Sequence, residues 1–179
     1  MRVITGTARG RKLITPNGLE TRPTSDKVKE GLFSAIQFDI EGRRVLDLFA
    51  GSGQMGIEAL SRGANSCIFV DSSKAAIYTI QENLKACNFK DNAKVFNTDY
   101  KSYLLGCNEV FDILILDPPY KSGVLKDAIT LASPLLSEYA IIICEHSFDL
   151  DIDDEICGFY AAKKYKYSKT AATIYRRKE

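Results

Sequence analysis

The strongest constraint in this sequence is a glycine-rich loop that lies between an apolar run and a helical pattern. Residues 45–49 (VLDLF) are typical of a strand, and Gly51, Gly53 and Gly56 then follow with the spacing G-x-G-x-x-G. The first two glycines allow a tight turn and a close approach of the backbone to a ligand. Asp71 ends the next apolar run, where a carboxylate can accept both hydroxyls of a ribose. Loop and acid together predict a site for a ligand that contains a nucleoside.

Strand and helix patterns alternate along the chain from residue 43 onward. Apolar runs of strand length occur at residues 45–49, 67–71, around 95–96, 111–116 and 140–145. Helical patterns lie between them, up to about residue 61, over 73–87, briefly after 99 and over 124–136. Residues 160–167 and 171–176 alternate with period two and predict an antiparallel pair. Such alternation requires a parallel sheet with helices on both faces, so we expect an α/β fold with a doubly wound, mostly parallel, seven-stranded, Rossmann-like sheet.

The amino-terminal part predicts a basic β-hairpin and a helix ahead of this sheet. Two short strands are expected at residues 2–6 and 9–14, with Gly6 and Gly10 allowing the turn, and a helix over 25–37. Either a phosphate-contacting arm or a charged sheet edge would explain the basic side chains here. The four that we single out are Arg9, Arg11, Lys12 and Arg22.

A second motif, Asp117-Pro118-Pro119-Tyr120, follows the strand predicted at 111–116. Proline cannot donate to a sheet ladder, so the two prolines end the strand abruptly, and Pro118 keeps Asp117 extended. The result is a rigid shelf with a carboxylate, a free carbonyl and an aromatic face. Such a shelf suits a planar group that carries an NH2, because the two oxygens accept its hydrogens and the ring stacks on its plane. A strand that simply ends in a Pro-Pro turn is the plainer interpretation.

Charge is unevenly distributed along the 179 residues. Residues 1–30 hold seven Lys or Arg against three acids, and residues 161–179 hold seven against one, in a chain of net charge +1. Basic ends around an acidic middle favour a polyanionic partner such as nucleic acid, although solvated termini would look the same. Five cysteines without a C-x-x-C pair and a single histidine, His146, argue against disulfides and a metal site, and no apolar run reaches membrane-spanning length. We expect a single cytoplasmic domain over the whole chain, with residues 1–40 preceding an α/β core at 41–179.

Four aspartates are expected at or near the carboxyl ends of strands, where a doubly wound sheet binds its ligands. They are Asp47, Asp71, Asp99 and Asp117. Asp47, just ahead of the glycines, would repel the pyrophosphate of NAD but would attract a sulfonium and an amino group. Four carboxylates around one cleft suit a cationic cofactor and an amine target, although any one of them could be a helix cap or a turn residue.

Together these motifs resemble the class I S-adenosylmethionine-dependent methyltransferases that carry an Asp-Pro-Pro-Tyr motif. More narrowly, the chain resembles the bacterial 16S ribosomal RNA guanine-N2 methyltransferase family, the small-subunit methyltransferase D group. The segment RPTSDKVKE is the most specific part of the likeness, because the other motifs occur widely among amino-methyltransferases. The stretches that carry it are Gly6–Leu13, Arg22–Glu30 with Leu32 and Phe33, Leu46–Gly53 with Gly56–Gly63, and Asp117–Tyr120.

The resemblance implies S-adenosylmethionine as the cofactor and 16S ribosomal RNA, in the 30S subunit or an assembly intermediate, as the partner. The expected reaction is methylation of the exocyclic N2 amine of a guanine, with neither a metal nor a membrane involved. The residues expected to hold the cofactor are Asp47, Phe49, Gly51, Gly53, Asp71, Ser72, Asp99 and Tyr100. The residues expected to be catalytic are Asp117, Pro118, Pro119 and Tyr120, and those expected to contact RNA are Arg9, Arg11, Lys12 and Arg22. Gly56 is expected to serve helix packing more than binding.

Other functions stay open at this point. The same shelf would serve DNA adenine-N6 or protein glutamine methylation, although 179 residues leave little room for a DNA target-recognition region. An NAD-dependent oxidoreductase shares the glycine loop, but the sequence shows no obvious proton donor for hydride transfer. A non-catalytic RNA-binding module could keep the same fold, and the intact Asp71 and Asp117 argue against that interpretation.

Overall fold

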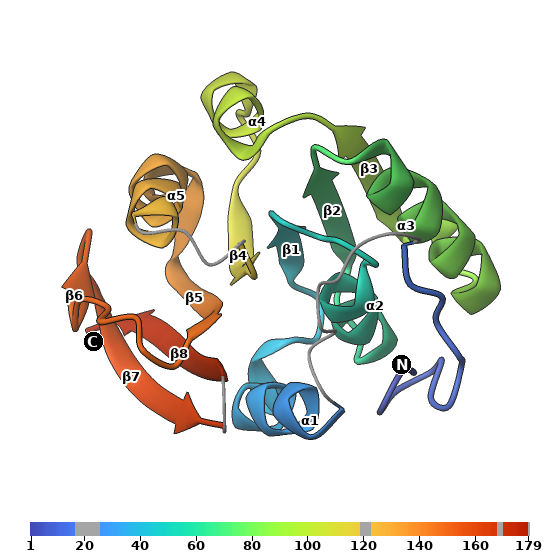
Figure 1. Cartoon of the computed structure of the whole chain (residues 1–179), viewed down its shortest axis with the longest axis horizontal. Coiled ribbons are helices and arrows are strands. Elements are labelled where there is room, and N and C mark those ends of the chain that lie inside the picture. The colour runs from blue at the N-terminus through green and yellow to red at the C-terminus, as the bar shows by residue number, and fades with distance from the viewer. Residues whose placement is uncertain (17–25, 119–122, 168–169, 179) are drawn as a thin grey trace.

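The computed structural model describes residues 1–16, 26–118, 123–167 and 170–178, which form a layered α/β fold (Figure 1). Its α-helices are α1 (Asp26–Ala35), α2 (Gln54–Ser61), α3 (Lys74–Cys87), α4 (Tyr100–Gly106) and α5 (Val124–Ala132). Its strands are β1 (Arg44–Asp47), β2 (Ser66–Asp71), β3 (Ala93–Asn97), β4 (Phe111–Leu116), β5 (Leu136–Ser147), β6 (Glu155–Ile156), β7 (Phe159–Lys166) and β8 (Thr170–Arg177). Short 3-10 helices are η1 (Gln37–Asp39), η2 (Lys90–Asn92) and η3 (Ser133–Leu135). None of these helices is long and apolar enough to cross a membrane.

In the described part of the chain, eight strands form one sheet in the order β3-β2-β1-β4-β5-β8-β7-β6. The first five strands in this order are parallel, and β8, β7 and β6 add to them in antiparallel fashion. The predicted α/β, doubly wound and mostly parallel sheet is confirmed, and β7 and β8 are the predicted antiparallel pair. The predicted number of seven strands is one too few. The missed strand is β6, which is only two residues long and has no apolar run that would indicate a strand in the sequence.

Helices cover both faces of the sheet, as Figure 1 shows. One face packs against α1, α2 and α3, through residues such as Leu32, Ile57 and Ile80. The other face packs against α4 and α5, through residues such as Leu104 and Ala128. Successive side chains of a strand point to opposite faces, so strand residues divide cleanly between these two apolar clusters.

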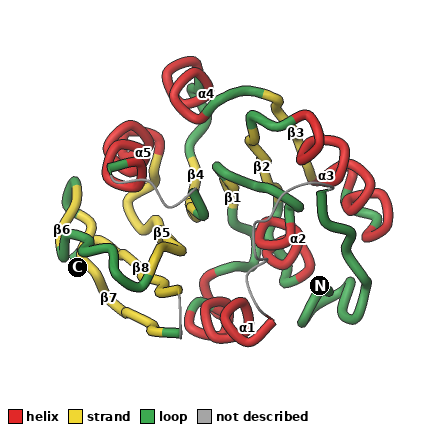
Figure 2. The backbone as a smooth tube through the Cα atoms, in the orientation of Figure 1, coloured by secondary structure: helices red, strands yellow, loops and turns green. Residues whose placement is uncertain are grey.

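The N-terminal segment, residues 1–16, runs beside α2 and α3 almost entirely as loop (Figure 2). The hairpin expected here is wrong in its extent, because the two strands are reduced to one antiparallel bridge between Arg2 and Lys12. Val3 still donates to the carbonyl of Arg11 at 3.0 Å across the turn, but the backbone around Thr5 bonds to α2, where the Ser61 hydroxyl donates to the carbonyl of Thr5 at 2.6 Å. The ladder stays short because side chains of α2 satisfy backbone groups that would extend it.

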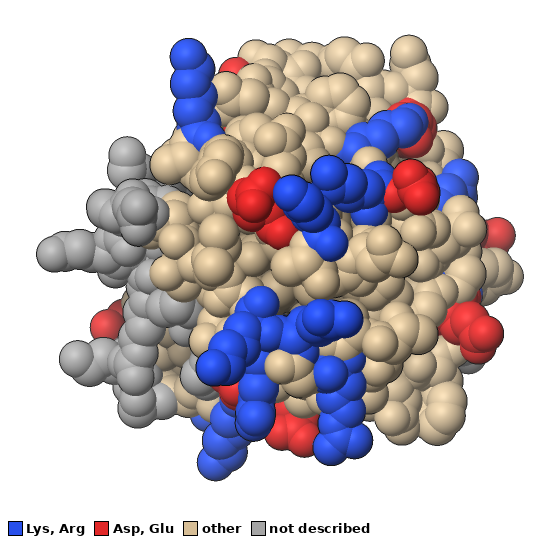
Figure 3. Space-filling model, turned by 90° about the vertical axis from the view of Figure 1, so that its right-hand side faces the viewer, with Lys and Arg blue, Asp and Glu red and all other residues tan. Residues whose placement is uncertain are grey.

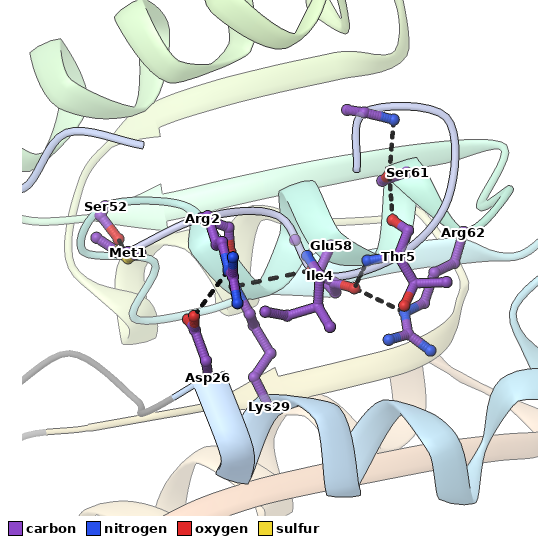
Figure 4. Close-up of polar contacts among 12 residues, drawn as sticks. Met1, Arg2, Ile4, Thr5, Asp26, Lys29, Ser52, Glu58, Ser61 and Arg62 are labelled. Atoms are coloured by element: carbon purple, nitrogen blue, oxygen red, sulfur yellow. Dashed lines mark hydrogen bonds and ion pairs between the residues drawn. The ribbon is translucent and has the colours of Figure 1, made fainter. Parts of the chain in front are cut away.

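Glu58 on α2 is the buried centre of these contacts (Figure 4). Its carboxylate accepts from the backbone N–H groups of Ile4, at 2.8 Å, and of Thr5, at 3.0 Å. It also pairs with Nζ of Lys29 on α1 at 3.7 Å and with Nε of Arg62 at 2.8 Å. The side chains of Glu58 and Lys29 have no exposed surface, so the loss of one partner would leave a buried unpaired charge. Glu58 therefore fixes the N-terminal segment and α1 to the helix that follows the glycine loop.

Gly6 is a point where the N-terminal segment presses closely on α2. Its φ is +87°, and a Cβ at this position would lie 1.7 Å from the carbonyl oxygen of Ser61. Gly10 has a similar φ of +82°, but a Cβ there would meet nothing within 4 Å. The two glycines therefore share a left-handed backbone and differ in packing.

We predict that Gly6→Ala destabilises the protein by roughly 1–3 kcal/mol more than Gly10→Ala. Both alanines carry the left-handed backbone cost of about 1 kcal/mol, but only the first adds a clash with a helix carbonyl, and overpacking costs roughly 1–3 kcal/mol. Chemical denaturation followed by circular dichroism measures both free energies of unfolding. Equal losses in the two variants would contradict the close packing of the N-terminal segment on α2.

Candidate active site

Carboxylates form a row along one face of the sheet, toward its carboxyl edge. The neighbouring strands β2, β1, β4 and β5 each carry or precede one of them, and these acids are Asp71, Asp47, Asp117 and Glu145. The residues two positions before them, such as Ile115 and Ile143, pack in the cluster with α1, α2 and α3. Because side chains alternate along a strand, all four acids belong to that same face.

Asp71 closes the glycine loop from the side of β2. Its Oδ2 accepts from the backbone N–H of Gly51 and its Oδ1 from that of Ser73, each at 2.8 Å. Each carboxylate oxygen keeps a further acceptor position, so Asp71 can accept ligand hydroxyls while it holds the loop. Gly51 has a φ of +55°, and a Cβ there would meet nothing within 4 Å, which leaves open space beside the loop.

Asp47 supports the same loop from inside the protein. It is 2% exposed, and its Oδ2 accepts from the backbone N–H of Gly56 in the first turn of α2, at 2.9 Å. Burial raises the pKa of Asp47 to about 7, and the charge of Asp71 adds to the rise, while the bond from Gly56 opposes it. The predicted packing role of Gly56 is confirmed, because a Cβ there would lie 2.4 Å from the ring of Phe69. Asp47 can therefore act on a ligand through its charge more than through an exposed oxygen.

Asp117 follows β4, which lies between β1 and β5, the strands of Asp47 and Glu145. Burial raises the pKa of Asp117 well above its usual range, and the charges of Glu145 and Asp47 raise it further. Glu145 is 4% exposed, and none of the sequence motifs points to it. The signal that marks it is a charged residue inside an apolar strand, which proteins seldom bury without a purpose. Three acids in such a poorly solvated place favour a positively charged ligand.

Asp99, which follows β3, differs from these acids in its exposure. It is the exposed N-cap residue of α4, where Oδ1 accepts from the backbone N–H groups of Lys101 and Ser102 at 3.0 and 3.1 Å. Its Oδ2 accepts from the Ser102 hydroxyl at 2.6 Å. These bonds, that from the Ser102 hydroxyl above all, lower the pKa of Asp99. The structure therefore gives Asp99 a capping function, and its role toward adenine stays a prediction.

The other expected cofactor residues lie around the ends of β1 and β2. The ring centroids of Phe49, after β1, and Tyr100, at the start of α4, are 5.2 Å apart. The Tyr100 hydroxyl donates to Asp127 of α5 at 2.6 Å, which holds the ring in place. Ser72 is exposed after β2, and its carbonyl accepts from the side-chain amide of Asn97 at 3.0 Å. Their contacts with a cofactor stay predictions.

Asn83 of α3 links the glycine loop to the N-terminal segment, a role that the motifs do not show. Its amide nitrogen donates to the carbonyls of Ser52, at 2.9 Å, and Ile14, at 3.0 Å, and its amide oxygen accepts from the N–H of Ile14 at 2.9 Å. The available signal is a polar residue between Ile80 and Leu84, on the inward face of the predicted helix. The loop and the N-terminal segment are thus held together.

The predicted RNA-contacting residues sit on the N-terminal segment. Arg9, Arg11 and Lys12 are all exposed, and Figure 3 shows Lys and Arg side chains gathered on the side of the molecule where this segment lies. Pro118 is buried directly after Asp117. Three predicted site residues lie outside the described part of the chain: Arg22, Pro119 and Tyr120.

A family model described as "Conserved hypothetical protein 95" matches residues 1–176. The chain belongs to this family. A solved structure titled "Putative methyltransferase yhhF from Escherichia coli" is 32% identical, with 99% of this chain and 98% of that chain covered and a TM-score of 0.89. This likeness confirms the predicted class I methyltransferase fold.

Curated relatives match over a shorter stretch. "Putative rRNA methyltransferase YlbH" of Bacillus subtilis is 61% identical over 71 residues, which are 40% of this chain and 39% of that protein. "Ribosomal RNA small subunit methyltransferase D" of Escherichia coli K12 is 44% identical over 75 residues, 42% of this chain and 38% of that protein. The matched stretch spans about two fifths of the length of these relatives. The resemblance to the small-subunit methyltransferase D group is confirmed.

We predict that Asp47→Asn changes the pH dependence of stability in a defined direction. A carboxyl with a pKa of about 7 in the folded protein, and about 4 when unfolded, binds more protons in the folded state between these values. Its burial therefore weakens the fold progressively as the pH rises from about 4 to about 7. Asparagine keeps an oxygen for Gly56 and carries no charge, so the variant should gain roughly 4 kcal/mol relative to the native protein over this range. Urea denaturation at a series of pH values measures the difference.

Asp99→Asn is the matched control, with the opposite sign. The pKa of Asp99 is lowered by folding, so this carboxylate stabilises the fold above its unfolded pKa and the contribution is lost as the pH falls. The Asp99→Asn variant should therefore lose stability relative to the native protein as the pH rises. Parallel curves for the native protein and Asp47→Asn would contradict a raised pKa at Asp47.

Proposed function

We propose that this protein transfers the methyl group of S-adenosylmethionine to the exocyclic N2 amine of a guanine in 16S ribosomal RNA. The observation that carries the proposal is the row of carboxylates from Asp71 to Glu145, which passes the Asp117-Pro118 shelf. A relative named as a ribosomal RNA small subunit methyltransferase supports the choice of substrate. The protein works as a single cytoplasmic domain on the small subunit or on an assembly intermediate.

The glycine loop and its acids fit this cofactor. S-adenosylmethionine supplies an activated methyl group on a positively charged sulfur. Asp71 has spare acceptor positions for the ribose hydroxyls, and the open space beside Gly51 admits a close ligand. Asp47 and Asp117 place negative charge in poorly solvated surroundings, where attraction to a cation is strong. The pyrophosphate of a dinucleotide would be repelled by the same acids.

Asp117 and the carbonyl of Pro118 act on the target amine. The lone pair of guanine N2 is delocalised into the ring, which makes the amine a weak nucleophile. Hydrogen bonds from its two hydrogens to the Asp117 carboxylate and the Pro118 carbonyl localise this pair on nitrogen and stabilise the positive charge that develops there. The rigid Asp-Pro backbone positions the amine for in-line attack on the methyl group of S-adenosylmethionine. The proton then leaves to Asp117 or to water, and a raised pKa makes Asp117 a suitable acceptor.

The target base has to leave its stack to reach this shelf. The predicted aromatic face of Tyr120 would replace the lost stacking. Phosphates that flank the base would be held by the exposed basic residues of the N-terminal segment, and we assign this role to Arg9, Arg11 and Lys12, with Arg22 beyond the segment.

The carboxyl-terminal strands carry two separate cation–aromatic pairs. Lys166 lies over the ring of Phe148 at 5.4 Å, and Lys178 lies over the ring of Tyr160 at 4.5 Å. The register of β7 and β8 places these pairs on opposite faces of the sheet, so they do not form one surface.

We predict that Asp117→Asn lowers the rate of methyl transfer at least about 100-fold, because an amide cannot accept the amine proton or stabilise the developing charge as a carboxylate does. Binding of S-adenosylhomocysteine should stay nearly unchanged. Transfer of a labelled methyl group to small ribosomal subunits measures the rate, and calorimetry measures binding. Asp91→Asn, an exposed site on η2, is the control and should keep native activity.

Product mapping tests the substrate. The native enzyme should restore one N2-methylguanine to 16S RNA from a strain that lacks this protein, as detected by mass spectrometry. It should be inactive on naked DNA and on protein glutamine. Full activity of Asp117→Asn would contradict the catalytic assignment, and a methylated adenine or glutamine would contradict the proposed substrate.

We predict that the triple variant Arg9→Ala, Arg11→Ala, Lys12→Ala binds RNA less tightly and with a weaker dependence on salt. Each lost phosphate contact should reduce the slope of log K against log salt by about 0.7, so three contacts reduce it by roughly 2. Filter binding of 16S RNA at several salt concentrations measures the slope. Removal of Lys94, Lys101 and Lys126, which pair with surface acids elsewhere, provides the matched control. The same slope change in both triples would refute a specific role for the N-terminal segment.

A further inference from the structure

Building on the proposed function, we infer that Glu145 selects guanine by accepting the N1–H of the target base while Asp117 accepts from its N2 amine. The two carboxylates then match the two neighbouring donors on the Watson–Crick edge of guanine. This assigns a specificity-determining role to a residue that lies outside the Asp-Pro-Pro-Tyr motif.

The sheet places the two acids side by side. Leu116, the last residue of β4, is in register with Cys144 of the parallel strand β5. The next residue along each strand direction is an acid: Asp117 directly follows β4, and Glu145 lies within β5. Both belong to the face that carries Ile115 and Ile143, so their side chains extend in the same direction from adjacent strands. Neighbouring strands lie about 4.8 Å apart, so both side chains can reach the edge of one base.

Glu145 stands out by its surroundings. It is 4% exposed, and β5 around it is apolar, from Ala140 to Cys144. Its charge acts on the neighbouring Asp117 and raises the pKa of that carboxyl. Buried acids that lie beside one another gather at functional sites. A carboxylate has two oxygens with about four acceptor positions, so contacts that Glu145 makes within the protein leave capacity for a base N–H.

The chemistry separates guanine from adenine at this position. Guanine presents N–H donors at both N1 and N2, whereas adenine presents an acceptor at N1 beside its amine. An adenine beside Asp117 would set its N1 lone pair against the Glu145 carboxylate, and two acceptors that face each other repel. Sites built to accept a hydrogen bond from a substrate donor strongly reject analogues that lack this donor.

The test replaces the methylated guanine, once mapped, by 2-aminopurine, which keeps the 2-amine but has an acceptor at N1. Small subunits are reconstituted with either RNA, and kcat/KM is measured for both. The native enzyme should prefer guanine by roughly 100-fold. In Glu145→Gln, whose amide can donate to N1, this preference should fall at least about tenfold. The missing O6 of 2-aminopurine affects both enzymes, so the change in the ratio reports on the contact at N1.

Glu138→Gln is the matched control, because it removes the same charge from an exposed position at the start of β5, and it should leave the ratio unchanged. Thermal stabilisation by S-adenosylhomocysteine shows that each variant is folded. If Glu145→Gln turns over too slowly, equilibrium binding of the two RNAs in the presence of S-adenosylhomocysteine gives the same ratio. An unchanged ratio in Glu145→Gln, or equal use of both RNAs by the native enzyme, refutes the role of Glu145. Absence of N2-methylguanine from the product of the native enzyme refutes the proposed function itself.

Discussion

The buried carboxylate of Glu58 decides how the functional parts of this fold are placed. All eight residues of α2 are buried, so a charge within this helix has to be matched inside the protein. Glu58 meets two backbone N–H groups of the N-terminal segment and the cations of Lys29 and Arg62. Burial lowers the pKa of Lys29, and the charge of Glu58 opposes that change. Because α2 begins at the glycine loop, this one cluster sets the loop, the basic segment and α1 relative to one another.

The same device, a carboxylate that accepts backbone N–H groups, recurs at the loop itself. Asp71 holds Gly51, and Asp47 holds Gly56, so both acids are oriented before a ligand arrives. They differ in exposure, since Asp71 is partly open to solvent and Asp47 is buried. Asp71 is therefore suited to direct contact with hydroxyls, whereas Asp47 contributes charge and loop geometry. Preorganisation of this kind lowers the reorganisation that binding requires.

Short-range sequence patterns correctly predicted those strands and helices that neighbouring residues alone determine. The strand at Phe111–Leu116 was predicted to the residue, because Pro118 ends it and apolar residues fill it. The short extent of the N-terminal hairpin was not predicted, because Glu58 and Ser61, about fifty residues away, take part of its backbone bonds and no short-range pattern shows them. Asp99 illustrates a further limit, since the sequence does not show that this acid after a strand also caps the next helix. A charged residue inside an apolar run, such as Glu145, indicates a functional residue more specifically than an acid that follows a strand.

The grouped acids also bear on how the site distinguishes donor from product. Before transfer the sulfur of the donor is positively charged, and afterwards it is neutral. With the proposed donor bound, Asp47 and Asp117 would lie near a cation, whereas with the product bound that positive charge is gone. Like charges in poorly solvated surroundings repel, and proton uptake by Asp117, whose pKa burial raises, relieves that repulsion. In the proposed reaction the methylated amine releases a proton at this place, so the repulsion between the acids would favour deprotonation of the product amine.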